Sequence, residues 1–109
     1  MWYLDSGCSR HMIGDVNLFV VLESRTGGKV TLGDNTTKKV VGAGIIDNSK
    51  NLMIENVLLV DGLKHNLLSI SQFCDNGFIV QFFANSCIVS LSNNIILQGK
   101  RINNATCLI

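Results

Sequence analysis

Short apolar segments recur along the chain, and Gly, Asn, Asp and Ser residues separate them. Alternation of apolar and polar residues, and short apolar runs between turn residues, both predict strands. Many short strands at close spacing are typical of an all-β sandwich or barrel. The segments that we expect to be strands are 2–4, 30–32, 39–41, 52–60, 78–82, 87–91 and 95–97.

Segments 30–32 and 39–41 lie on either side of a turn sequence and predict a β-hairpin. The tip of this hairpin is expected at Gly33, Asp34 and Asn35. Gly42 and Gly44 follow in the returning arm. A glycine within a strand usually marks a bulge or a close approach of two backbones, so we expect an irregular strand there.

One segment predicts a helix instead of a strand. Apolar residues between 67 and 74 recur near i, i+3, i+4 spacing. Asn66 or Ser69 is a suitable N-cap, and Asn76 with Gly77 is a suitable stop. We therefore expect one helix of roughly eight to ten residues in the C-terminal half. The fold class predicted is all-β, a small closed β-barrel with one short helix.

The composition fits a single domain that covers residues 1–109. Hydrophobic residues make up 47% of the chain and charged residues 16%, and there is no proline to form a stiff linker. The net charge is +1 with Lys and Arg spread along the chain, so we expect no nucleic-acid partner. No apolar run approaches the length of a membrane span, so we expect no membrane partner. The four scattered cysteines favour a reduced, intracellular protein.

The clearest candidate for chemistry is the turn Asp5-Ser6-Gly7, which follows the apolar segment 2–4. A strand can hold a catalytic carboxylate rigidly, a glycine permits a sharp turn, and a hydroxyl can orient the carboxylate. A solvated turn at a strand end would have the same three residues. The tripeptide alone leaves these two interpretations open.

Cysteine and histidine residues offer a second candidate site. Cys8 and His11 have the spacing of a zinc-ligand pair, and Cys74 and Cys87 would complete a tetrahedral set, but those two do not form a second close pair. The competing interpretation is that the cysteines are small buried hydrophobic residues and that His11 hydrogen-bonds a loop. A Cys8–His11 nucleophile pair lacks a third, orienting residue. We expect no metal and no cofactor.

Four separated motifs carry a resemblance to a known family. They are WYLDSGCSRHM at 2–12, VTLGDN at 30–35, NLLSISQFCDNGF at 66–78 and QGKR at 98–101. In content and order they resemble the retropepsin-like aspartic protease region of copia-type (Tnt-like) LTR retrotransposon Pol polyproteins. The resemblance extends over nearly the whole chain.

The resemblance implies a role for each matching residue. Asp5 would be the catalytic aspartate, Ser6 the hydroxyl that orients it and Gly7 the turn. The hairpin tip at Gly33, Asp34 and Asn35 would be a flap that closes over a bound peptide. Residues 67–69 would pack behind the active-site turn, with the following helix as a support.

The resemblance also implies an activity. Because the chain has a single Asp-Ser-Gly, two chains would each supply Asp5 in a homodimer that cleaves its own Gag-Pol polyprotein, in a cytoplasmic virus-like particle. The sequence would be a piece of that polyprotein, with a strand before Trp2 and with residues 99–109 beginning the next segment. The alternatives are a catalytically silent β-barrel that serves as a binding or structural module, and a zinc-stabilised domain.

Overall fold

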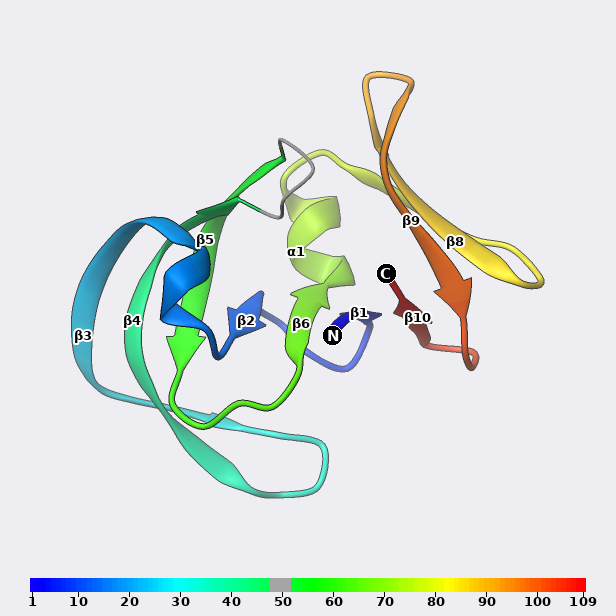
Figure 1. Cartoon of the computed structure of the whole chain (residues 1–109). Coiled ribbons are helices and arrows are strands. Elements are labelled where there is room, and N and C mark those ends of the chain that lie inside the picture. The colour runs from blue at the N-terminus through cyan, green and yellow to red at the C-terminus, as the bar shows by residue number, and fades with distance from the viewer. Residues whose placement is uncertain (48–51) are drawn as a thin grey trace.

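The computed structural model describes residues 1–47 and 52–109 (Figure 1). In this part of the chain, ten strands form one sheet in the order β3-β4-β5-β2-β6-β1-β10-β9-β8-β7. The all-β prediction is confirmed. The sheet is not closed into a barrel as expected, because β3 and β7 lie at its two ends and do not pair with each other.

The elements follow one another along the chain with mostly short connections. The strands are β1 (Trp2–Asp5), β2 (Met12–Ile13), β3 (Phe19–Thr31), β4 (Thr37–Asp47), β5 (Met53–Val60), β6 (Asn66–Ser69), β7 (Ile79–Phe82), β8 (Ser86–Leu91), β9 (Asn94–Arg101) and β10 (Thr106–Leu108). A 3-10 turn, η1 (Val16–Leu18), precedes β3, and the helix α1 (Ile70–Asp75) follows β6 directly.

Strand β1 lies in the middle of the sheet. It pairs in parallel with β6, with Asp5 opposite Ser69, and antiparallel with β10, with Asp5 opposite Thr106. The two ends of the chain therefore lie close together in the centre of the molecule (Figure 1). Because both edges of β1 are paired, its C-terminal end is held in place from both sides.

The β3–β4 hairpin is much longer than the segments 30–32 and 39–41 predicted for it. Side chains of β3 are exposed along most of the strand, so its sequence lacks the apolar–polar alternation that reveals a half-buried strand. The register shifts between Ser24 and Gly28, where Gly27 has a φ of 82°. The hairpin curves around one side of the molecule and crosses below it (Figure 1).

The prediction for the two glycines of β4 is confirmed. The register between β4 and β5 shifts after Val40 and again after Gly44. A Cβ atom on Gly44 would overlap the backbone carbonyl of Val21 on β3. Glycine is therefore required at position 44 for the two arms of the hairpin to approach.

The helix α1 is confirmed, but it has six residues and is shorter than expected. Leu67 and Leu68 belong to β6, because pairing with β1 takes precedence over their helical spacing. Ser69 is the N-cap: its Oγ accepts a 3.1 Å hydrogen bond from the amide of Gln72. The stop is confirmed as well, since the helix ends at Asp75 and Gly77 has a φ of 87°.

The remaining strands form two hairpins, β7–β8 and β8–β9. Ser92 and Asn93, in the turn between β8 and β9, both have positive φ, as a type I′ turn requires. A disulfide joins Cys87 on β8 to Cys107 on β10, with the two Cα atoms 6.5 Å apart. The expectation that all cysteines are reduced is wrong for this pair.

The buried side chains form two clusters. The larger lies around α1 and includes Leu4, Ile13, Ile46, Ile54, Val57, Leu68, Phe73, Cys87, Val89, Leu97 and Cys107. The smaller lies under the base of the β3–β4 hairpin and consists of Met12, Val40, Ala43, Leu58 and Val60. Leu4 of β1 belongs to the larger cluster, and Cys8, just after the Asp-Ser-Gly turn, packs against the smaller one.

Candidate active site

Asp5 is the last residue of β1 and begins the Asp-Ser-Gly turn. The preceding Leu4 is fully buried, whereas Asp5 is half-buried and Ser6 and Gly7 are exposed. The amide of Gly7 donates a 2.8 Å hydrogen bond to Oδ1 of Asp5, and the amide of Ser6 donates to the carbonyl of Ala105 at 3.1 Å. The carboxylate is therefore oriented by its own turn and faces solvent on one side.

The segment that follows the turn is held by residues from the start of α1. The Oγ of Ser69 donates to the carbonyl of Cys8 at 2.8 Å, and the amide of Ser69 donates to Nδ1 of His11 at 2.9 Å. The side chain of Gln72 accepts from the amide of His11 at 2.7 Å and donates to the carbonyl of Asn56 at 3.0 Å. This network fixes residues 8–11 against the helix. The prediction that His11 is a structural, hydrogen-bonded residue is confirmed.

His11 is held in its neutral form. Its side chain is 1% exposed, and its ring centroid lies 4.5 Å from that of Phe73. Burial, with a further effect from the charge of Arg10, lowers the pKa of His11 to about 4. A neutral ring can accept the hydrogen bond from Ser69 at Nδ1, which a doubly protonated ring cannot.

The thiol of Cys8 lies beside the candidate carboxylate. Its Sγ is 3.7 Å from the backbone carbonyl of Asp5. Burial, together with the charge of Asp5, raises the pKa of Cys8 to about 11. A thiol with so high a pKa is protonated near neutral pH, and Nδ1 of His11 is already engaged with Ser69. The Cys8–His11 nucleophile pair is therefore disfavoured.

The four residues of the zinc alternative do not come together. Cys87 is bonded to Cys107, and Cys74 is exposed on α1. Among residues 1–47 and 52–109, no group of three or more His, Cys, Asp or Glu is placed to hold a metal ion. The expectation that Cys74 is a buried hydrophobic residue is also wrong, whereas Cys87 is fully buried.

The tip of the β3–β4 hairpin is a tight turn. The amide of Leu32 donates to the carbonyl of Thr36 at 2.8 Å, and Asn35 has a φ of 65°. Oδ1 of Asp34 accepts from both the amide and the hydroxyl of Thr36, and these bonds lower the pKa of Asp34. Gly33, Asp34 and Asn35 are all exposed.

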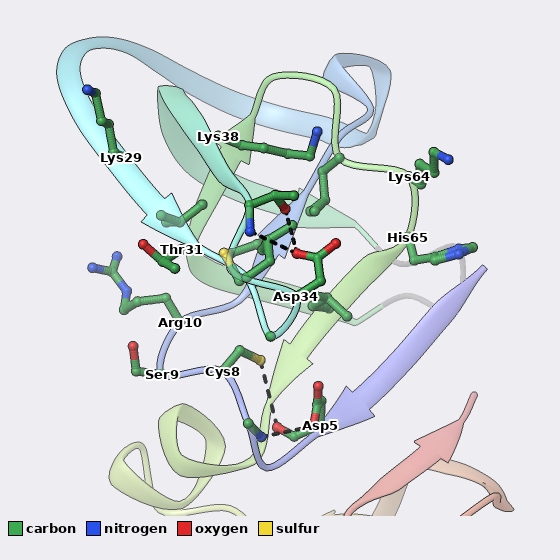
Figure 2. Close-up of a pocket in the computed structure, with 18 residues that line it drawn as sticks. Asp5, Cys8, Ser9, Arg10, Lys29, Thr31, Asp34, Lys38, Lys64 and His65 are labelled. Carbon is green, nitrogen blue, oxygen red and sulfur yellow. Dashed lines mark hydrogen bonds between the residues drawn. The ribbon is translucent and has the colours of Figure 1, made fainter.

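A cleft of about 760 Å³ lies between the Asp-Ser-Gly turn and the hairpin tip (Figure 2). Asp5 and Gly7 line it on the turn side, and Gly33 and Asp34 line it on the hairpin side. Neither Ser6 nor Asn35 is among its lining residues. The apolar side chains that line it are Met12, Val30, Leu32, Leu63 and Leu67. The volume and the mixed lining are those of a ligand site.

Sequence reasoning missed the cationic side chains of this cleft. Arg10, Lys29, Lys38 and Lys64 come from four separate segments and all line it. In Figure 2, Lys29, Lys38 and Lys64 lie beyond Asp34 as seen from Asp5, and Arg10 lies to one side of the hairpin tip. Spacing along the chain gave no sign of this cluster, because only the folding of the hairpin over the turn assembles it.

A comparison with known families assigns the chain to one of them. The chain belongs to the family described as "Pol polyprotein, beta-barrel domain", whose model matches residues 2–78. The match includes β1, the β3–β4 hairpin and α1, the elements that form or support the cleft. The resemblance to a retrotransposon Pol polyprotein is confirmed at this level.

Individual relatives give the same assignment. The chain is 33% identical over 106 residues to the retrovirus-related Pol polyprotein from transposon RE1 of Arabidopsis thaliana, and 32% identical over 106 residues to that from transposon RE2. Each match covers 91% of this chain but 7% of the relative, so the chain corresponds to a small part of each polyprotein. No solved structure matches the chain. No helix in the described ranges is long and apolar enough to span a bilayer.

Proposed function

We propose that this chain is the aspartic endopeptidase domain of a copia-type retrotransposon Pol polyprotein, active as a homodimer on its own polyprotein. The observation that carries the proposal is the position of Asp5. Its carboxylate stands at the end of a central strand, in an Asp-Ser-Gly turn, on one side of a cleft whose other side is a hairpin tip. A virus-like particle in the cytoplasm is the setting that this function implies.

The need for two chains follows from the chemistry of a single carboxylate. One carboxyl group cannot at the same time remove a proton from water and protonate the peptide carbonyl. The chain has one Asp-Ser-Gly, and this turn is exposed on its outer side at Ser6 and Gly7. A two-fold axis beside the turn would bring two Asp5 carboxyl groups together without disturbing either sheet.

The number of protons that such a pair holds determines the mechanism. Two carboxyl groups in contact share one proton, since their charges repel. The ionised group takes a proton from water as the water oxygen bonds to the peptide carbon, and the protonated group donates to the carbonyl oxygen. The tetrahedral intermediate then breaks its C–N bond: the amine leaves with the proton of the pair, and a hydroxyl of the intermediate returns a proton to the other carboxylate as the carboxylic acid product forms, so that the pair again holds one proton.

The surroundings of Asp5 support this role. The amide of Gly7 holds Oδ1, and Ser69 and Gln72 hydrogen-bond to Cys8 and His11, so hydrogen bonds hold the turn and the segment after it in place without a substrate. The apolar lining of the cleft suits hydrophobic side chains of an extended peptide. The hairpin tip is exposed and can close over such a peptide.

The test is cleavage of a peptide library by the purified chain, with products read by mass spectrometry. Asp5→Asn keeps the size of the side chain but removes the acid, and it should abolish cleavage with no change in the circular dichroism spectrum. Asp75→Asn is the matched control, because Asp75 is exposed at the end of α1 and does not line the cleft. It should cleave like the wild type. A wild-type chain that cleaves nothing would favour the silent-barrel alternative.

A further inference from the structure

The cleft concentrates positive charge in a chain that is nearly neutral overall. Among the residues that the structure describes, four of the chain's nine Lys and Arg line the cleft, against two of its eight Asp and Glu. Of the other carboxylates, Glu23 and Glu55 line a second, smaller hollow that Arg10 also borders, and the whole chain has a net charge of +1. The excess of cations is therefore local to the cleft.

The two carboxylates offset only part of this charge in a working site. Asp34 accepts from the amide and hydroxyl of Thr36 in the hairpin tip, and its charge also interacts with that of Lys38, so it offsets one of the four cations. Asp5 would share one proton with its counterpart in the dimer, so each chain would contribute about half a negative charge there. The cleft therefore keeps a net positive charge that faces a bound ligand.

The cationic side chains lie on more than one side of the cleft. Lys38 extends from β4 toward the loop between β5 and β6, where a Cβ on Gly62 would stand 3.5 Å from its Nζ. Lys64 comes from that same loop, whereas Arg10 comes from the segment after the Asp-Ser-Gly turn. In Figure 2, Lys38 and Lys64 are separated from Arg10 by the hairpin tip. Arg10 and Lys64 therefore lie toward opposite ends of a peptide held between Asp5 and the hairpin tip.

We infer that the cleft selects acidic peptides: extended segments with apolar residues at the bond to be cut and Asp or Glu on both flanks. The inference rests on the proposed function and names its substrate class. The apolar lining receives the central side chains, and Arg10, Lys38 and Lys64 attract the flanking carboxylates. Because these cations are at or near the surface, they act mainly on the rate of association and are screened by salt.

The test uses three fluorogenic peptides with one apolar centre and with Glu, Gln or Lys at the four flanking positions, assayed at pH 6, where Glu is ionised. The Glu peptide should have a kcat/KM about tenfold above that of the Gln peptide, with the Lys peptide lowest. Raising the ionic strength from about 0.05 M to about 0.5 M should remove most of this preference. Equal kcat/KM for the three peptides would overturn the inference and leave the protease function standing.

A pair of variants separates the effect of charge in the cleft from the effect of the net charge of the chain. Lys38→Glu should lower kcat/KM for the Glu peptide by about tenfold or more and reverse the preference. Lys39→Glu makes the same change of charge at the next residue of β4, which is exposed and does not line the cleft. It should keep the preference. If both variants lose it equally, the effect is not one of the cleft and the inference fails.

Binding to the Asp5→Asn chain tests selection without catalysis. Fluorescence anisotropy should show the Glu peptide bound more tightly than the Gln and Lys peptides. If the Glu peptide binds most tightly but the wild-type chain cleaves none of the peptides, the protease proposal is overturned. The inference that the cleft binds acidic peptides would still stand. Tighter binding of a single-stranded RNA oligonucleotide than of the Glu peptide would overturn the inference, because the cations would then serve phosphates.

Discussion

The Oγ of Ser69 donates a 2.8 Å hydrogen bond to the carbonyl of Cys8, a residue 61 positions earlier in the chain. The same Oγ accepts from the amide of Gln72 and so caps α1. One buried hydroxyl therefore joins the segment after the Asp-Ser-Gly turn to the start of the helix. Strands β1 and β6 end side by side, with Asp5 opposite Ser69, and this pairing places the hydroxyl where the turn needs it.

Ser69→Ala removes both of these hydrogen bonds and a third, between the hydroxyls of Ser69 and Ser71 at 3.1 Å, and it leaves the carbonyl of Cys8 without its partner. The loss of a helix cap and of a buried hydrogen bond should lower the free energy of unfolding by about 1–3 kcal/mol. Urea denaturation measures this change. Ser24→Ala, which removes the same hydroxyl group at an exposed position on β3, is the control and should cost much less. Equal losses in the two variants would contradict the assigned role of Ser69.

His11 should make the fold sensitive to acid. In the unfolded chain its pKa is near 6.5, and burial lowers it to about 4 in the folded chain. As the pH falls from about 6.5 to about 4, the unfolded state takes up the proton first, so stability is lost across this window and levels off below it. The shift corresponds to a loss of up to about 3 kcal/mol. Denaturant unfolding at a series of pH values measures it.

The contribution of His11 must be separated from that of the carboxylates, which also titrate in acid. His11→Asn retains a side-chain oxygen that can accept from the amide of Ser69 but has no proton to take up. The variant should be less stable at pH 7, because it loses the ring packed on Phe73. Its stability should fall less between pH 6.5 and pH 4 than that of the wild type. Parallel curves for the two proteins would show that His11 is not the titrating group.

Gly44→Ala should distort the β3–β4 hairpin, because the added Cβ meets the carbonyl of Val21. We expect a loss of about 1–3 kcal/mol, typical of overpacking against a backbone that cannot move freely. Thermal unfolding gives the comparison. Gly33→Ala, at the hairpin tip, has nothing within 4 Å of the added Cβ and is the matched control. A Gly44→Ala chain as stable as Gly33→Ala would mean that the two arms are farther apart than described.

Reduction of the Cys87–Cys107 disulfide should lower the melting temperature. The bond joins residues 20 positions apart, and a loop of this length is expected to contribute about 3 kcal/mol. Scans with and without dithiothreitol measure the effect. In the Cys87→Ala/Cys107→Ala chain the reductant should have no effect. A count of four free thiols in the untreated protein, instead of the two at Cys8 and Cys74, would contradict the pairing.

The sequence predicted the strands whose side chains alternate between buried and exposed, and the turns and caps whose residues have a clear backbone preference. The two glycines of β4 and the stop at Gly77 were recognised, and Ser69 was one of two candidates for the N-cap, because each reflects a local requirement of the backbone. Strand β3 was missed over most of its length, since exposed side chains on an edge strand leave no periodic pattern. Leu67 and Leu68 were assigned to the helix because only a partner 60 or more residues away, β1, makes them a strand.

The candidate site was predictable only in part. Asp5 and the hairpin tip were singled out by motif, and the structure places them on the same cleft. The cluster of Arg10, Lys38 and Lys64 was not predictable, because its members come from different elements and only tertiary folding brings them together. The disulfide was missed for the same reason: β8 and β10 are separated in the sheet by β9.

The central claim is that two Asp5 carboxyl groups from two chains form one catalytic site. The most direct measurement is the peptidase activity of wild-type chains mixed and re-equilibrated with Asp5→Asn chains at constant total protein. If both carboxyl groups are required, only wild-type pairs are active, and an equal mixture should retain roughly one quarter of the wild-type activity. An equal mixture that retains about one half, as independent chains would, contradicts the account.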